Sequence, residues 1–137
     1  MISIYTDGSA KTNGDPDSEG TYCYVVTSNG DFVYEYASHT KYTTNNRMEM
    51  SAFMMALLYA YNHHPNEAVN IISDSQIVIN GYTGMWGTKS NLDIWKNIKS
   101  LKAKLPKVKA VWVRGHNGNK FNERADKLCT ASYKLEI

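Results

Sequence analysis

The fold of this chain is decided near its beginning, by the stretch ISIYTDGS at residues 2–9. Its β-branched and aromatic residues predict a short strand that ends at Asp7, directly before a glycine. We expect this opening strand to lie at the centre of a sheet, which would place the Asp7 carboxylate on a rigid floor within reach of other elements. The same Asp-Gly pair is also common in hairpin turns, and that simpler interpretation stays open.

The rest of the chain alternates between strand-like and helix-like segments. No internal repeat, low-complexity stretch or linker interrupts it, so we expect one α/β domain over residues 1–137. The first three predicted strands are joined by turn-forming residues and should form an antiparallel meander. In chain order we predict strands over 2–7, 21–27 and 32–38, a buried helix over 48–61, a strand over 68–73, helices over 75–80 and about 91–105, a strand over 109–114, and a last helix capped by Asn122.

Three later acids fall where such a fold would bring them near Asp7. Glu49 is the one charge in an otherwise apolar helix, Asp74 follows the fourth strand, and Asp126 lies early in the last helix. Ligand sites in α/β sheets lie at the carboxyl ends of strands, which is where we expect these acids to meet.

Each acid also has a simpler explanation. Asn46 and Glu49 have the spacing of a capping box, and any residue of 73–75 could cap the helix that follows. An acid in the first turn of the last helix is favoured by the helix dipole. These alternatives weaken when the acids are considered together, because four neighbouring carboxylates repel one another and raise each other's pKa unless cations neutralise them.

The composition is that of an ordinary soluble protein, with 42% hydrophobic and 20% charged residues. No apolar run reaches the roughly 18 residues that span a membrane, and no basic and apolar leader precedes the first strand, so we expect a cytoplasmic protein. The two cysteines, Cys23 and Cys129, form neither a disulfide framework nor a metal cluster. We expect both to be buried and reduced.

The net charge of +2 hides a strong asymmetry. Residues 89–114 carry eight basic residues and one acid, whereas residues 1–88 carry three basic and nine acidic residues. An acidic half beside a basic segment is typical of a cation site next to a track for a polyanion, although lysines on a helix are more commonly only a solvated face. A hard, oxygen-ligated cation that accepts phosphate oxygens is Mg²⁺, which Mn²⁺ can replace. Two such ions cut phosphodiesters by activating water on one side and stabilising the leaving oxygen on the other.

Five motifs resemble those of type 1 ribonuclease H in the order and spacing of that family. They are TDGS at 6–9, TNNRME at 44–49, SDSQ at 73–76, WVRGH at 112–116 and NERAD at 122–126, so the resemblance covers essentially the whole chain. It implies a ribonuclease H-like fold: a five-stranded mixed sheet with the first three strands antiparallel, flanked by helices. It also implies Mg²⁺-dependent endonucleolytic cleavage of the RNA strand of RNA/DNA hybrids, leaving 5′-phosphate and 3′-hydroxyl ends.

The resemblance also implies roles for single residues. Asp7, Glu49, Asp74 and Asp126 would hold two Mg²⁺ ions, with Asp7 shared between them and the Gly8 carbonyl as an additional ligand. His116 would assist proton transfer or product release. The family's contacts to the hybrid, which distinguish RNA by its 2′-hydroxyls and do not read base sequence, would fall on Ser9, Asn13, Asn45, Asn46 and Gln76, with Thr44 and Asn91 at a DNA-strand phosphate.

The chain departs from the family in one place. Many members carry a basic, tryptophan-rich protrusion that grips the hybrid, whereas only residues 81–90 occupy that position here, with Trp86 and Lys89 as candidates. The lysines of residues 96–109 are further candidates to replace it. We expect a monomer, with a polymerase or another replication protein as a partner that the sequence does not establish.

Three alternatives remain beside this interpretation. An integrase, transposase or junction resolvase shares an acidic metal site, but the fourth acid and the loop around His116 fit ribonuclease H better. A catalytically weak hybrid-binding module, or a nuclease domain that works beside a polymerase, would share the same motifs. A small cation-binding protein is disfavoured because the chain has no EF-hand loop.

Overall fold

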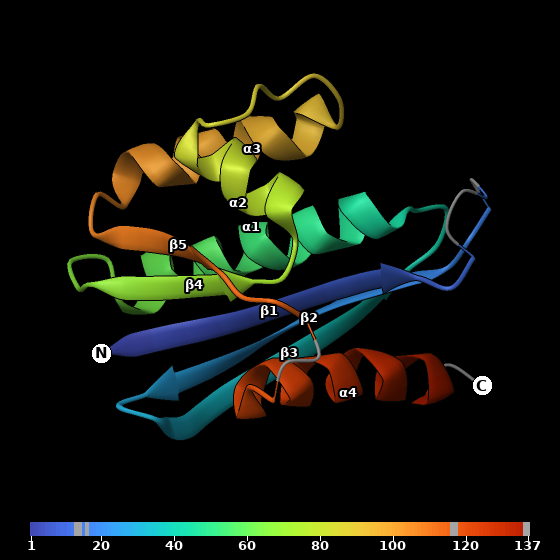
Figure 1. Cartoon of the computed structure of the whole chain (residues 1–137), viewed down its shortest axis with the longest axis horizontal. Helices are drawn as coiled ribbons and strands as arrows, with labels where there is room; N and C mark the ends of the chain where they lie inside the picture. The colour runs from blue at the N-terminus through green and yellow to red at the C-terminus, as the bar shows by residue number, and fades with distance from the viewer. Residues whose placement is uncertain (13–14, 16, 116–117, 136–137) are drawn as a thin grey trace.

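The computed structural model describes residues 1–12, 15, 17–115 and 118–135, with side chains up to residue 131. Its five strands form one mixed sheet, and four helices flank it (Figure 1). The strands are β1 (Ile2–Ala10), β2 (Gly20–Ser28), β3 (Asp31–Thr40), β4 (Val69–Ser73) and β5 (Val108–Trp112), and the helices are α1 (Asn45–His63), α2 (Gln76–Thr83), α3 (Leu92–Lys104) and α4 (Lys120–Leu135).

The strand order β3-β2-β1-β4-β5 puts β1 at the centre of the sheet. β1, β2 and β3 are antiparallel to one another, while β4 is parallel to β1 and β5 is parallel to β4. The predicted five-stranded mixed sheet with an antiparallel meander is therefore confirmed, and so is the central place of the first strand.

The central strand is longer than predicted, and this creates the space for a site. β1 runs to Ala10, and Asp7 pairs with Cys23 of β2, so the expected end at Asp7 and the alternative of an Asp-Gly turn are both wrong. Pairing with β4 stops at Tyr5. The second half of β1 thus extends past the end of β4, and Asp7 lies at that step in the sheet.

One face of the sheet is covered by α1, α2 and α3 (Figure 1). Side chains alternate between the two faces of a strand, and Ile2 and Ile4 of β1 point into the core on this face. Phe53 and Leu57 of α1 are fully buried there, as is Ile98 of α3. This large core holds the sheet and three of the helices together.

The other face is covered by α4. Among the side chains that the structure describes, its core consists of Cys23 and Val25 from β2 with Phe121, Ala125 and Cys129 from α4. Tyr5 of β1 packs against this cluster, with its ring 5.5 Å from that of Phe121. Asp7, two residues after Tyr5 on the same strand, therefore belongs to the α4 face of the sheet.

The helix starts differ from prediction in detail. The last helix begins at Lys120, two residues before the expected cap, and the side-chain oxygen of Asn119 accepts a hydrogen bond from the Asn122 backbone N–H at 3.0 Å. Asn122 is thus inside the helix and 5% exposed. Among the described residues, none of the helices combines the length and the apolar character needed to cross a membrane.

Candidate active site

Three acids from three different elements meet at the step in the sheet. Asp7 comes from β1, Glu49 from the first turns of α1, and Asp74 follows β4 directly. Each offers one carboxylate oxygen, and these oxygens all lie within 4.8 Å of one another. The structure thus brings together three of the four acids that the sequence singled out.

Gly8 allows α1 to approach the central strand this closely. A Cβ atom at this position would lie 2.6 Å from the Glu49 backbone nitrogen and would also collide with the Met48 carbonyl group. The Gly8 backbone N–H in turn stabilises the charged carboxylates of Asp7 and Glu49. The glycine therefore sets the distance between β1 and Glu49.

Gly115 and Trp112, which the sequence placed in the WVRGH motif without a role of their own, fix the position of Asp74. A Cβ atom on Gly115 would lie 2.9 Å from the Asp74 carboxylate, and the Trp112 indole Nε1 donates a 3.1 Å hydrogen bond to the Asp74 backbone oxygen. The signal in the sequence was Gly115, which comes soon after β5, the strand that pairs with β4. The end of β5 thus forms one wall of the acidic cluster.

Asp126 reaches the site from the opposite face. It lies on α4, half-buried, and contributes both its charge and a side-chain hydrogen bond at Asp7. It does not belong to the group of three oxygens that lie within 4.8 Å of one another. The fourth acid is therefore a neighbour of Asp7 rather than of the whole cluster.

The electrostatics of the cluster are unfavourable without a cation. Burial, with repulsion from Asp74 and then Asp126, raises the pKa of Asp7 to about 7. Burial and repulsion from Asp7 and Asp74 also raise the pKa of Glu49 well above its usual range. Although Glu49 is only half-buried as a residue, its Oε2 atom is inaccessible and has no hydrogen-bond partner among the described residues. Buried carboxylates of this kind are the hard oxygen ligands that Mg²⁺ or Mn²⁺ requires.

The capping explanations for two of the acids are wrong. Thr44 caps α1, since its hydroxyl accepts a hydrogen bond from the Arg47 backbone N–H at 3.3 Å, and Asn46 is already inside that helix. Ser75 caps α2 and accepts from the Val78 N–H at 3.3 Å. Neither Glu49 nor Asp74 is therefore needed to begin a helix.

The predicted substrate contacts on α1 and α3 lie around one arginine that sequence analysis did not single out. Arg47 donates a 3.1 Å hydrogen bond to the Asn91 side chain and two hydrogen bonds, of 3.1 and 2.8 Å, to Asp93. Asn91 has a left-handed backbone conformation, with φ of 54°. Arg47 thereby fastens the start of α3 to the start of α1, near Thr44.

The other predicted substrate residues are scattered around this end of the molecule. Asn45 begins α1 and accepts a 2.5 Å hydrogen bond from the Ala10 backbone N–H, which ties α1 to the end of β1. Asn46 and Gln76 are exposed in the first turns of α1 and α2, and Ser9 is half-buried on β1. Trp86, in the segment between α2 and α3, is 46% exposed. Asn13 and His116 lie outside the described residues.

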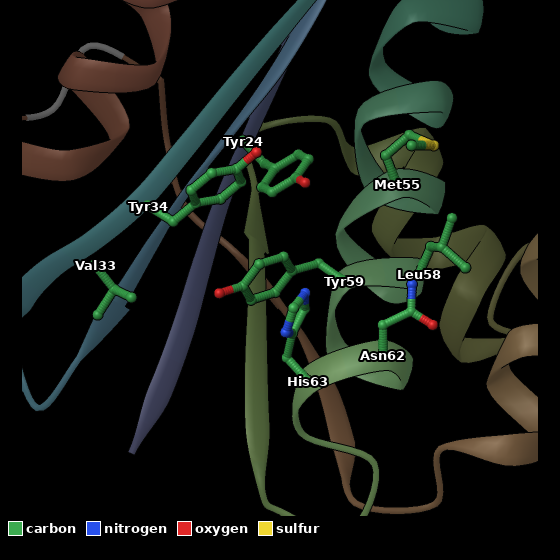
Figure 2. A pocket seen from close by; sticks show the side chains of 8 residues that line it. All are labelled: Tyr24, Val33, Tyr34, Met55, Leu58, Tyr59, Asn62 and His63. Atoms are coloured by element: carbon green, nitrogen blue, oxygen red, sulfur yellow. The ribbon is translucent and has the colours of Figure 1, made fainter.

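A pocket of about 520 Å³ lies far along α1 from Glu49 and contains none of these residues. The rings of Tyr34 and Tyr59 are nearly parallel there, with centroids 5.7 Å apart (Figure 2). The pocket is lined by Tyr24, Val33, Tyr34, Met55, Leu58, Tyr59, Asn62 and His63.

Comparison with known proteins places the chain in a family. The family model described as RNase H matches residues 1–134. The chain is 34% identical to Ribonuclease H of Lachnoclostridium phytofermentans, over 96% of this chain and 90% of that protein, and 35% identical to Ribonuclease H of Trichodesmium erythraeum, over 99% and 91%.

Solved structures show the same fold. RNase H1 from the halophilic archaeon Halobacterium salinarum is 25% identical, with a TM-score of 0.77 over 97% of both chains. LC11-RNase H1, solved in complex with an RNA/DNA hybrid, is 24% identical, with a TM-score of 0.82 over 98% of this chain and 99% of that one. From the acidic cluster, the sheet order and these matches together, we conclude that this chain belongs to the ribonuclease H family.

Proposed function

We propose that this protein hydrolyses the RNA strand of RNA/DNA hybrids endonucleolytically, leaving 5′-phosphate and 3′-hydroxyl ends. The observation that carries this proposal is the cluster of Asp7, Glu49 and Asp74, in which a buried Glu49 oxygen has no partner among the described residues. Family membership supports the substrate class, because the curated relatives carry the name ribonuclease H.

The cluster fits a pair of Mg²⁺ ions, with Mn²⁺ able to replace them. Asp7, Glu49, Asp74 and Asp126 would hold such ions, with the Gly8 carbonyl as an additional oxygen. When bound, such ions lower the pKa of water to give a nucleophile and stabilise the charge on the leaving oxygen. The protein's own part is to hold four carboxylates close together, on β1, on α1, directly after β4 and on α4, against their mutual repulsion.

Residues around the cluster would position the hybrid. Thr44 and Asn91 lie on the two helix starts that Arg47 joins, which suits a grip on a phosphate of the DNA strand. The exposed side chains of Asn46 and Gln76 flank the acids and suit contacts with 2′-hydroxyls in the minor groove. Ser9, Asn13 and Asn45 complete this proposed surface, Trp86 is proposed to contact the hybrid, and His116 to assist proton transfer or product release.

We assign these side chains to phosphates and 2′-hydroxyls, which carry no information on base sequence. We therefore propose cleavage that depends on the geometry of the hybrid and not on its sequence. We also propose that the protein acts as a monomer. The segment between α2 and α3 is short and offers few residues to bind the hybrid. The alternative functions are therefore a catalytically weak hybrid-binding module, or a nuclease domain that relies on a polymerase to bind the hybrid.

The test is cleavage of one labelled RNA presented in a hybrid with DNA and in double-stranded RNA, with the matching double-stranded DNA as a third substrate, each with Mg²⁺ and with EDTA. We expect cleavage of the hybrid's RNA strand only, and none in EDTA. Equal cleavage of duplex DNA would favour the integrase and resolvase class. A folded protein that binds the hybrid without cutting it would favour the hybrid-binding module.

A further inference from the structure

Two cysteines that are far apart in sequence meet beneath the candidate active site. Cys23 on β2 and Cys129 on α4 are separated by 106 residues, yet their sulfur atoms lie 2.7 Å apart. Both side chains are buried, with 0% and 2% of their surface exposed, and both are free thiols in this structure. The proposed function uses neither of them.

The surroundings hold the two sulfur atoms in place. The Cys23 Sγ is 3.0 Å from the Ala125 backbone oxygen, and the Cys129 Sγ is 3.5 Å from the Asp7 backbone oxygen. On the other side, the Thr21 hydroxyl donates a 3.3 Å hydrogen bond to the Cys129 backbone oxygen. The two thiols are thus fixed between the strand pair β1–β2 and the helix that carries Asp126.

We propose that Cys23 and Cys129 are a site of covalent modification, at which a hydroperoxide oxidises the pair to an intramolecular disulfide that ties α4 to β2. One thiol gives up two electrons to the peroxide O–O bond and becomes a sulfenic acid, while the peroxide is reduced to an alcohol or water. The sulfur of the second thiol then attacks the sulfenic sulfur, and the hydroxyl group leaves with the thiol proton as water. Two thiols are oxidised and one peroxide is reduced.

Little movement is needed to form this bond. A disulfide has an S–S distance of about 2.05 Å, so the two sulfur atoms have to approach each other by less than about 1 Å from their present separation. Asp7 faces Cys23 across the β1–β2 pair, and Asp126 lies one helical turn before Cys129. We therefore expect the disulfide to form without displacing the carboxylates.

The cross-link should stabilise the fold strongly, because it joins residues 106 positions apart and the entropy that a disulfide removes from the unfolded chain grows with loop length. For a chain of this length, the resulting rise in the melting temperature Tm is roughly 10 °C. It also adds a covalent anchor to α4, which is otherwise held by the small core on its face of the sheet, by the Arg124–Glu35 ion pair and by the Thr21 hydrogen bond. Because both thiols are buried, the oxidant should reach them only slowly.

The experiment is to treat the folded, full-length protein with hydrogen peroxide or tert-butyl hydroperoxide and to remove the oxidant. Free thiols are then counted under denaturing conditions, and intact mass and Tm are measured before and after reduction. We expect loss of both thiols, a mass lower by two hydrogen atoms, a monomer on a non-reducing gel, and a higher Tm that reduction reverses. Cys23→Ser and Cys129→Ser, with Cys23→Ala and Cys129→Ala as apolar counterparts, should show neither the mass loss nor the rise in Tm.

Several outcomes would overturn the proposal. The first is two free thiols after an exposure that fully oxidises the urea-unfolded protein. The second is addition of oxygen to one sulfur without loss of the other thiol, and the third is a disulfide between two copies of the chain. A rise in Tm that the Cys23→Ala variant shows equally would also contradict it. None of these readouts requires the protein to cut nucleic acid.

Discussion

The two faces of the sheet hold the site with very different strength. Among the residues whose side chains the structure describes, 19 are buried in one continuous core under α1, α2 and α3, whereas five are buried under α4. Glu49 lies on α1 and Asp74 directly follows β4, and both of these elements pack in the large core. Asp126 lies on α4, which packs in the small core. Asp7, on the strand between them, interacts with acids from both sides.

This difference suggests that the site has a rigid part and a weakly anchored part. Local stability follows the amount of apolar surface that an element buries, so α4 should open more readily than α1 or β4. A metal site needs most of its ligands preorganised, but an acid that can adjust its position tolerates changes in the substrate. We therefore expect losses to be largest at the shared strand and smaller at α4.

The largest loss of cleavage should come from substituting Asp7, the acid that interacts with acids from both faces of the sheet. Asp7→Asn removes the charge that contacts Glu49, Asp74 and Asp126 while changing the volume little, so we expect cleavage to fall by about 1,000-fold or more with the fold intact. Hybrid cleavage in Mg²⁺ and circular dichroism would measure this. Asp31→Asn, at an exposed acid beyond the site, is the matched control. Cleavage by Asp7→Asn at the parent rate would show that the metal site is wrongly assigned.

Matched truncations should separate the two cores. Leu57→Ala leaves a cavity in the large core, where the side chain is fully buried, and should lower the free energy of unfolding by about 2 to 5 kcal/mol. Phe121→Ala removes a ring at the start of α4 that is 9% exposed and packs against the smaller cluster, so it should cost less than the roughly 3 to 5 kcal/mol typical of a buried Phe→Ala change. Urea unfolding measures both. If Phe121→Ala cost as much as Leu57→Ala, α4 would not be the weaker side.

The sequence predicted the framework of this arrangement because it rests on local patterns. Alternating strands and turn residues define the meander, and an acid in an apolar helix marks Glu49 as unusual. The same patterns misplaced the end of β1, because a glycine was taken as a turn although Gly8 is needed for the approach of α1. Such a requirement comes from a partner 40 residues away and leaves no local signal.

The unequal roles of the four acids also lay beyond the sequence. Motif spacing treats Asp126 like the others, and only the packing of α4 shows that it lies outside the group of three. The same holds for Gly115 and Arg47, whose importance depends on the side chains opposite them. Which of several polar residues caps a helix, as Thr44 and Ser75 do, is likewise settled by the packing of the helix.

The next largest effect should distinguish the fourth acid from the other three. Because Asp126 contacts Asp7 but not the whole cluster, we expect Asp126→Asn to slow cleavage by about 10- to 100-fold, less than Asp74→Asn does. Single-turnover cleavage of a saturating hybrid by the two variants, side by side, gives the comparison. An equal or larger loss for Asp126→Asn would mean that α4 belongs to the rigid part of the site.

The pH dependence of stability should also show that Asp7 interacts more strongly with Asp74 than with Asp126. The pKa of Asp7 in the folded protein is about 7, above its unfolded value near 4, so the folded state binds more protons between these values. Stability of the metal-free protein should therefore fall as pH rises from about 4 to about 7, by up to about 4 kcal/mol, since each pKa unit corresponds to about 1.4 kcal/mol. Mg²⁺ should restore part of the loss at pH 8 by binding the folded state.

The measurement is a melting curve of the protein in EDTA at each pH. Variants of the acids then show which carboxylates cause the fall in stability. Asp7→Asn should flatten the fall, and Asp74→Asn should reduce it more than Asp126→Asn, because Asp74 raises the pKa of Asp7 more strongly. A metal-free protein that becomes more stable as pH rises through this window would contradict the ionisation assigned to Asp7.

The smallest effect should come from the link between the two helix starts on the large-core face. Arg47 holds Asn91 and Asp93 through a planar fork that a lysine cannot reproduce. Arg47→Lys should therefore loosen the proposed phosphate contact at Asn91 and raise KM for the hybrid about threefold, with kcat unchanged. Asp93→Asn keeps the Arg47–Asn91 hydrogen bond and is the matched control, with a smaller rise in KM. A fall in kcat for Arg47→Lys at unchanged KM would show instead that the arginine acts on Glu49, two residues along α1, and that the rigid side of the site is less preorganised than its core implies.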